Sequence, residues 1–218
     1  MRMPRPILLT GFEPFGADPD NPAQEVVRAL ADTRIGAHPV VGAILPVAFS
    51  RTRERIDALL AEHTPGVVLA LGLAGGRSEL SFERVALNLI DARIADNEGA
   101  QPIDVRVVEH GPAACFATLP LKAIVAELHA RGIPAGLSLS AGTYVCNQVM
   151  YLFAHRLAQC APTARCGFLH LPWLPHQAAR HPGQPSMALS TMLEGVQVAL
   201  QCALTIEHEL QASGGTIA

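Results

Sequence analysis

The residues of this chain with the clearest chemical potential are Cys146 and His170. A thiol is a strong nucleophile only as thiolate, which forms near neutral pH beside an imidazole or at the N-terminus of a helix. Cys146 follows a short apolar run and a turn at Gly142, and residues 147–159 carry apolar side chains at close to helical spacing. We therefore expect Cys146 at a strand-to-helix junction, where free backbone N–H groups stabilise an anion. The alternative is a structural cysteine, because free cysteines are commonly buried.

Short apolar runs alternate with amphipathic stretches along the whole chain. This alternation predicts a doubly wound α/β fold with a largely parallel sheet, and the lack of a linker or repeat predicts one domain over residues 1–218. The stretch 67–71 is almost wholly aliphatic, as in a parallel strand covered on both faces. Expected strands cover residues 7–10, 40–45, 67–71, 135–140 and 167–172, and expected helices cover residues 22–31, 50–63, 121–128, 147–159 and 186–210.

Ligands of open α/β sheets bind beyond the carboxyl ends of the strands. Residues 11–16, 72–77 and 142–146, together with His170, follow expected strands, so we expect these four segments to converge on one rim. The stretch 83–99 places charged residues in an otherwise apolar chain. A carboxylate from this stretch could orient the histidine, whereas a surface loop would account for most of its charges.

The composition excludes several classes of protein. Half of the 218 residues are apolar, 16% are charged and the formal net charge is −3. Without a Lys/Arg cluster, nucleic acid and anionic membranes are poor candidates as partners, and no segment is long enough to cross a membrane. The five cysteines are odd in number and form no CxxC pair, which favours reduced thiols in the cytoplasm. The nine histidines form no HExxH pattern, so we expect no metal site.

Several long motifs occur in one order along the chain. They cover residues 8–16 with 21–22, 72–77, 83–88, 91–99, 140–147 and 167–172. Through these motifs the chain resembles the pyroglutamyl-peptidase I (pyrrolidone-carboxylate peptidase) family of cysteine peptidases along almost its whole length. The resemblance implies an α/β/α sandwich with a twisted, largely parallel open sheet. It also implies a homotetramer, without metal or organic cofactor, that removes an N-terminal pyroglutamyl (5-oxoprolyl) residue from small peptides through a thioester.

The resemblance also implies a role for individual residues. Cys146 would be the nucleophile, His170 the general base and then acid, and Glu83 the residue that orients His170. Arg93 would lie near the developing oxyanion. Aromatic side chains would form the walls of the pocket for the lactam ring. Main-chain groups around Phe15 and Leu73 would bond the edge of the lactam. The pocket residues are Phe12, Phe15, Asn21, Leu73 and Tyr144.

Four positions depart from the family pattern. Trp173 stands where Tyr is usual and His176 where Glu is usual, and Tyr144 replaces what is often Phe. Leu73 stands where some members have a polar residue, a change that main-chain bonding would tolerate. None of the four belongs to the set of nucleophile, base and orienter, so they bear on local packing. The added hydroxyl of Tyr144 must find a partner.

Two other function classes are consistent with the residues. A nucleoside phosphorylase shares the architecture, and Gly75, Gly76 and Arg77 could cradle phosphate. That loop lacks the Lys and Ser/Thr of a P-loop, and phosphorolysis would leave Cys146 without a role. A thiol sensor or small-molecule-binding protein is the second class, and it would show reversible oxidation of Cys146 without turnover.

Overall fold

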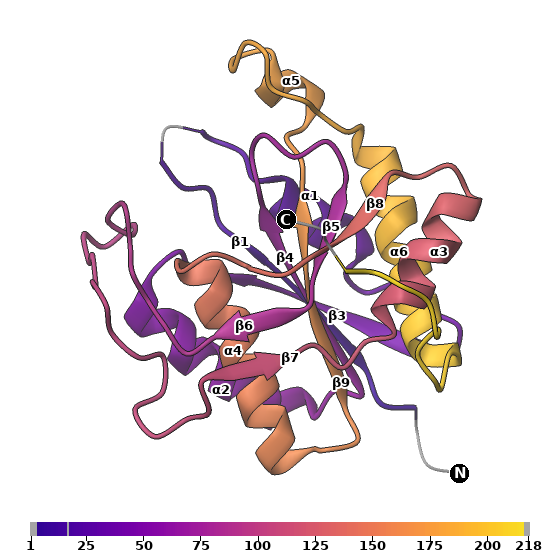
Figure 1. Ribbon diagram of the computed structural model, residues 1–218, viewed down its shortest axis with the longest axis horizontal. Coiled ribbons are helices and arrows are strands. Elements are labelled where there is room, and N and C mark those ends of the chain that lie inside the picture. Colours follow the sequence, from indigo (N-terminus) through magenta and orange to yellow (C-terminus); the bar gives the residue numbers. More distant parts are fainter. Residues whose placement is uncertain (1–3, 17, 216–218) are drawn as a thin grey trace.

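A sheet forms the centre of the molecule (Figure 1). It has seven strands in the order β2-β3-β1-β4-β9-β5-β8. The computed structural model describes residues 4–16 and 18–215. Strands β3, β1, β4 and β9 are parallel to one another, whereas β5 runs antiparallel to β9 and parallel to β8. The strands are β1 (Ile7–Phe12), β2 (Arg34–Ile35), β3 (His38–Leu45), β4 (Val67–Leu73), β5 (Leu80–Glu83), β8 (Ala135–Ser138) and β9 (Arg165–Leu171). A separate antiparallel pair consists of β6 (Val85–Leu87) and β7 (Ala114–Phe116).

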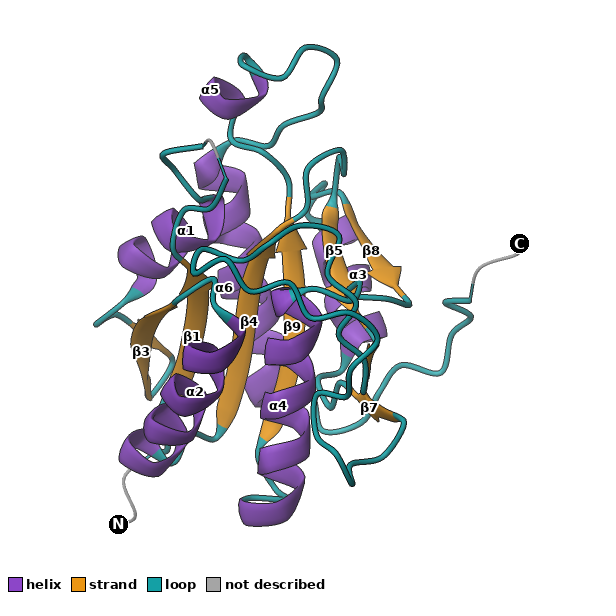
Figure 2. Cartoon of the chain, turned by 90° about the vertical axis from the view of Figure 1, so that its left-hand side faces the viewer, coloured by secondary structure: helices purple, strands orange, loops and turns teal. Residues whose placement is uncertain are grey.

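Helices cover both faces of the sheet (Figure 2). One face carries α1 (Pro22–Leu30), α3 (Leu121–Ala130) and α6 (Leu189–Thr205), and the other carries α2 (Phe49–His63) and α4 (Val145–Cys160). The short α5 (Pro175–Ala178) follows β9. Within the described residues, no helix is long and apolar enough to span a membrane.

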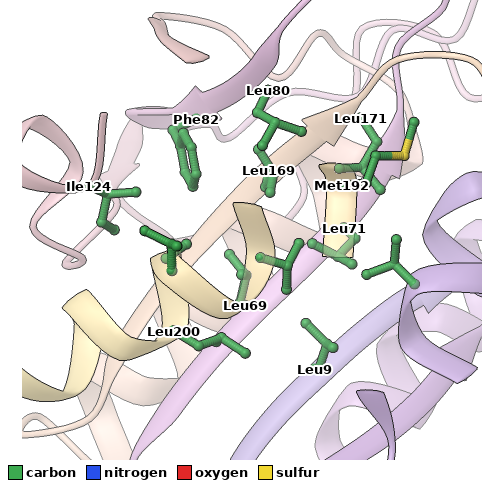
Figure 3. Packing of buried hydrophobic residues seen from close by; sticks show 14 of the residues in the cluster. Leu9, Leu69, Leu71, Leu80, Phe82, Ile124, Leu169, Leu171, Met192 and Leu200 are labelled. Carbon is green, nitrogen blue, oxygen red and sulfur yellow. The ribbon is translucent and has the colours of Figure 1, made fainter. Parts of the chain in front are cut away.

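Alternating side chains of the central strands fill two cores. Leu9, Leu69 and Leu71 belong to the core beneath α1, α3 and α6 (Figure 3), whereas Leu8 and Val68 belong to the core beneath α2 and α4. Successive residues of a strand point to opposite faces, so a strand buried on both faces needs a continuous aliphatic run. The predicted α/β/α sandwich with a largely parallel sheet is confirmed.

The region between residues 80 and 116 differs most from expectation. Its strands β5, β6 and β7 have only three or four residues each, which is too short to display a hydrophobic period. The helix expected over residues 186–210 is shorter in the structure, where α6 covers only Leu189–Thr205.

The direction of β8 corrects one expectation about the rim. Because β8 is parallel to β5 and β5 is antiparallel to β9, the carboxyl end of β8 points away from the edge that β1, β4 and β9 reach. Residues 139–144 then cross the molecule to the start of α4 (Figure 1). The prediction that the turn before Cys146 follows a strand at that rim is therefore wrong, although α4 does begin beside the ends of the central strands.

The first turn of α1 packs closely against β1 at Gly11. A Cβ atom at this position would lie 2.6 Å from the carbonyl oxygen of Ala23 and 2.8 Å from its carbonyl carbon. Main-chain atoms cannot move aside as a flexible side chain can, so this contact requires glycine. It seats α1 on the strand that ends at Phe12.

We expect Gly11→Ala to lower the free energy of unfolding by about 1–3 kcal/mol, because the added methyl group forces α1 away from β1. Denaturant-induced unfolding followed by circular dichroism measures this change. Gly215→Ala is the matched control, since a Cβ atom there meets no atom within 4 Å. Equal stability of the two variants would contradict the proposed packing constraint.

Candidate active site

A cavity of about 190 Å³ lies at the carboxyl ends of the central strands. Its walls come from the ends of β1, β4 and β9, from the loops that follow β1 and β3, and from the start of α4. Cys146 and His170 both line it, and of the site residues expected from the sequence only Glu83 and Arg93 lie outside the lining. The lining residues are Phe12, Phe15, Asn21, Val47, Leu73, Ala141, Tyr144, Val145, Cys146 and His170.

Cys146 is the second residue of α4, whose N-cap residue makes no side-chain capping bond. The thiol therefore lies at the positive end of the helix dipole. A Cβ atom at Gly72 would be only 3.0 Å from its Sγ, so the missing side chain at Gly72 gives the sulfur access to the sheet. Gly72 is the register partner of His170 on the neighbouring strand. The thiol and the imidazole thus meet at one cavity.

Asn147 fixes the first turn of α4. Its Oδ1 accepts a hydrogen bond from the N–H of Leu87 at 2.8 Å, and its Nδ2 donates to the carbonyl oxygens of Leu87 and Leu89, both at 2.9 Å. Asn147 is fully buried, so the side chain serves this purpose alone. These bonds join the residue after Cys146 to the end of β6 and to Leu89. The sequence did not predict them.

Burial controls the protonation of Cys146. Desolvation and the negative charge of Glu83 raise the pKa of the Cys146 thiol to about 12, against the opposing effects of its own backbone N–H and of Arg77. The sequence predicts a thiolate near neutral pH, but burial outweighs the helix terminus and the thiol is neutral at rest. Nucleophilic attack must therefore be coupled to removal of the thiol proton by a neighbouring base.

His170 is placed to be that base. Its Nδ1 lies 2.7 Å from Oε1 of Glu83, and both side chains are buried. Burial lowers the pKa of His170 although Glu83 opposes the effect, so the imidazole is neutral at rest. Burial by itself raises the pKa of Glu83, but the hydrogen bond and charge of His170 lower it below its ordinary value. An ionised carboxylate only accepts hydrogen bonds, so Nδ1 carries the proton and Nε2 is free to accept one.

Arg77 is a charged neighbour of Glu83 that the sequence did not predict. Its Nη1 lies 2.8 Å from the same Oε1 of Glu83 that accepts the bond from His170. The sequence singles out Arg77 only as a phosphate ligand next to Gly75 and Gly76. Its guanidinium is bound to Glu83 instead, which removes the observation that favoured a phosphorylase. Within residues 4–16 and 18–215, no group of three or more His, Cys, Asp and Glu side chains could hold a metal ion.

Arg93 is exposed and does not line the cavity. The segment that carries it is bound to the loop before α4. The N–H of Asp91 donates to the carbonyl oxygen of Thr143 at 3.0 Å, and the hydroxyl of Thr143 donates to the carbonyl oxygen of Asp91 at 2.7 Å. The hydroxyl of Tyr144 finds its partner here as well, at 3.1 Å from the carbonyl oxygen of Ala95.

Asn21 lines the cavity but uses its amide group within the fold. Its Oδ1 caps α1 by accepting from the N–H of Ala23 at 3.0 Å, and its Nδ2 donates to the carbonyl oxygen of Glu13 at 3.1 Å. The Glu13 carboxylate is engaged too: its Oε1 accepts from the N–H of Val47 and from Asn97 Nδ2, both at 3.0 Å. Among residues 4–16 and 18–215, no carboxylate lines the cavity.

The unusual residues after β9 pack without disturbing the site. Trp173 stacks on His181 with ring centroids 4.6 Å apart. A Cβ atom at Gly75 would lie 2.7 Å from the Nε1 atom of Trp173. His176 places its Nε2 3.1 Å from an Oδ2 of Asp20. Trp173 and His176 thus connect the segment around α5 to the loops that follow β4 and β1.

Comparison with known proteins gives relatives along nearly the full length. Pyrrolidone-carboxylate peptidase of Cupriavidus taiwanensis is 52% identical over 212 residues, which are 97% of this chain and 98% of the relative. The protein of the same name from Bacillus cereus is 46% identical over 210 residues, 96% of this chain and 98% of the relative. The sequence model of the pyroglutamyl peptidase family matches residues 5–206.

Solved structures agree with these relatives. Pyroglutamyl peptidase I from Bacillus amyloliquefaciens superposes with a TM-score of 0.93 at 36% identity, covering 97% of this chain and all of that one. Pyrrolidone carboxyl peptidase from Thermococcus litoralis gives a TM-score of 0.89 at 40% identity, covering 92% of this chain and 93% of that one. The resemblance seen in the sequence motifs is confirmed, and the chain belongs to the pyroglutamyl peptidase family.

Proposed function

We propose that this chain is a cysteine peptidase that removes an N-terminal pyroglutamyl residue from small peptides, with Cys146 as nucleophile, His170 as base and acid, and Glu83 as the orienting carboxylate. The observation that carries this assignment is one small cavity lined by Cys146 and by a neutral imidazole that a buried carboxylate holds by Nδ1. Family membership supports the same activity.

The reaction begins when Nε2 of His170 takes the proton of the Cys146 thiol. The sulfur attacks the carbonyl carbon that joins the pyroglutamyl residue to the next amino acid, and the carbonyl oxygen becomes an oxyanion. His170 then gives the proton to the leaving amine, which departs and leaves a thioester on Cys146. A water molecule, deprotonated by His170, attacks the thioester. The carbon–sulfur bond then breaks, the sulfur takes the proton back from His170, and pyroglutamate is released. Glu83 stabilises the imidazolium that forms in each half of the reaction.

The oxyanion is stabilised chiefly by the N–H groups in the first turn of α4. One such donor is typically worth about 3 kcal/mol of transition-state stabilisation. Arg93 is not in the cavity lining in this conformation, so we assign it the secondary role of placing positive charge at the outer edge of the site.

The cavity suits a small neutral ring. Its volume of about 190 Å³ accommodates a five-membered ring, and Phe12, Phe15 and Tyr144 supply apolar walls. A charged α-ammonium group would be buried without a counter-ion, because the lining holds no carboxylate and Glu13 is engaged with Val47 and Asn97. Since Asn21 uses its amide to cap α1, main-chain groups around Phe15 and Leu73 bond the lactam.

The state of the cysteines bears on the cellular compartment of the protein. All five cysteines are free, which agrees with a reducing compartment, and we propose a cytoplasmic enzyme. The resemblance to the family suggests a homotetramer.

Cys146→Ala should abolish turnover of a pyroglutamyl amide and leave the circular dichroism spectrum unchanged, because the nucleophile is lost without a change in packing at the surface of the sheet. Cys160→Ala, which alters an exposed cysteine, should retain full activity. Substantial turnover by Cys146→Ala would end the cysteine-peptidase assignment.

Glu83→Gln should lower kcat by more than about tenfold with only a modest change in KM, because only the imidazolium of the transition state needs the negative charge. Steady-state kinetics on a pyroglutamyl amide give both constants. Wild-type kinetics of Glu83→Gln would show that Glu83 does not orient the base.

Pyroglutamyl amides should be cleaved, whereas prolyl, glutaminyl and glutamyl amides should be poor substrates. The prolyl ring has the right size but carries a charge and lacks the lactam carbonyl, and a site that bonds a polar group discriminates strongly against its absence. Values of kcat/KM across the four amides test this expectation. Comparable values for the prolyl and pyroglutamyl amides would refute the neutral-lactam pocket even if Cys146 proves catalytic.

A further inference from the structure

Arg77 contacts the active-site residues through Glu83 and not through the Cys146 cavity. Its guanidinium bonds to Glu83 Oε1 at 2.8 Å, and the same oxygen accepts the bond from His170 Nδ1 at 2.7 Å. Arg77 itself lines a different, open cleft of about 460 Å³. None of the residues of that cleft lines the Cys146 cavity, so Arg77 does not reach the substrate site. The residues of the cleft are Gly76, Arg77, Ser78, Glu79, Ser81, Leu137, Ser138 and Leu139.

The Glu83 carboxylate needs a counter-ion that does not change during the reaction. Its side chain is 0% exposed, and its Oε2 has no hydrogen-bond partner among the described residues. An uncompensated buried charge is strongly unfavourable. His170 balances this charge only while it is protonated, which is during part of the cycle. The Arg77 guanidinium remains charged throughout, and its partial exposure of 32% lowers its own desolvation cost.

We propose that Arg77 is a positioning residue of the peptidase reaction: its guanidinium holds the buried Glu83 carboxylate in place and balances its charge, so that His170 is oriented by Glu83 and still releases its proton to the leaving amine. This inference rests on the proposed function of Cys146, His170 and Glu83. Without Arg77, the buried Glu83 carboxylate would lose its permanent counter-ion, and its full charge would act on the imidazole and on the thiol.

The charged and titratable groups that face His170 are Glu83 from β5, Cys146 from α4 and Arg77 from the loop after β4. Burial lowers the pKa of His170, Glu83 raises it and Arg77 lowers it. The charge of Arg77 also lowers the pKa of Cys146. Loss of this positive charge therefore raises both pKa values, and the pair of thiol and imidazole gives up its first proton at a higher pH. The direction is the same whichever of the two groups loses that proton.

The experiment measures kcat and KM for a pyroglutamyl amide against pH in Arg77→Gln, Arg77→Lys and the wild-type protein. In Arg77→Gln we expect the acidic limb of kcat/KM to move up by about one pH unit and kcat to fall by about tenfold, with KM within about twofold. Arg77→Lys keeps the charge and should keep the wild-type acidic limb. Arg156→Gln is the matched control, because Arg156 pairs with Asp57 at 2.9 Å and is similarly exposed, at 35%, but lines a different cavity. It should leave the profile unchanged.

A second measurement does not depend on turnover. The rate at which iodoacetamide alkylates Cys146, followed by peptide mass spectrometry against pH, reports formation of the thiolate, and its midpoint should also rise in Arg77→Gln because the charge of Arg77 lowers the pKa of Cys146. An unchanged midpoint in Arg77→Gln, or an equal shift in Arg77→Lys, would overturn the role of the charge. If Cys146 is alkylated as expected but the protein cleaves no pyroglutamyl amide, the proposed function is wrong. The midpoint of the alkylation rate still tests whether the charge of Arg77 acts on the thiol and imidazole.

Discussion

The buried bond between His170 and Glu83 is the interaction on which the arrangement of the site depends. A carboxylate with no exposed surface is stable only when hydrogen bonds and a counter-ion compensate for its lost hydration. The short strand β5 meets this need by running antiparallel beside β9, which sets Glu83 opposite Phe168 and close to the imidazole two residues further on. The loop after β4 then supplies Arg77. Two separate segments, β9 and the loop after β4, therefore bond to one oxygen atom of Glu83.

Burial also determines how the thiol reacts. A thiol at a helix N-terminus would ionise readily in an exposed position, but the surroundings of Cys146 are apolar enough to raise its pKa to about 12. The resting site therefore holds a neutral thiol beside a neutral imidazole. Such a site would lose little when a neutral lactam displaces its water, and it would disfavour a charged amine for the same reason. The proposed reactivity and the proposed substrate preference would then follow from one physical property, the low polarity of the cavity.

Close main-chain packing gives the site its precision. Gly72 leaves the space in which the sulfur of Cys146 approaches the sheet, and a Cβ atom there would also lie 2.8 Å from the ring of Phe168. On the other side, the bonds of Asn147 to β6 keep the first turn of α4 from moving away. The thiol of Cys146 is held between a strand and a hydrogen-bonded helix turn, both rigid elements, which would give a nucleophile at this position a fixed geometry.

Elements with a strong local signal are predictable from the amino-acid sequence alone: the aliphatic strands around Leu9 and Leu69, the helix that follows Cys146, and the pairing of Cys146 with His170 in family motifs. The resemblance to the family predicted most of the cavity lining, and Phe12, Leu73 and His170 do lie in the last residues of recognisable strands. The short strands of residues 80–116, the reversed direction of β8 and the bond of Arg77 to Glu83 were decided only in the tertiary structure. Strands of three or four residues carry no period, and a strand's direction depends on its neighbours in the sheet. The ionisation state of a thiol likewise depends on how much water and charge surround it in space, which no local pattern of residues records.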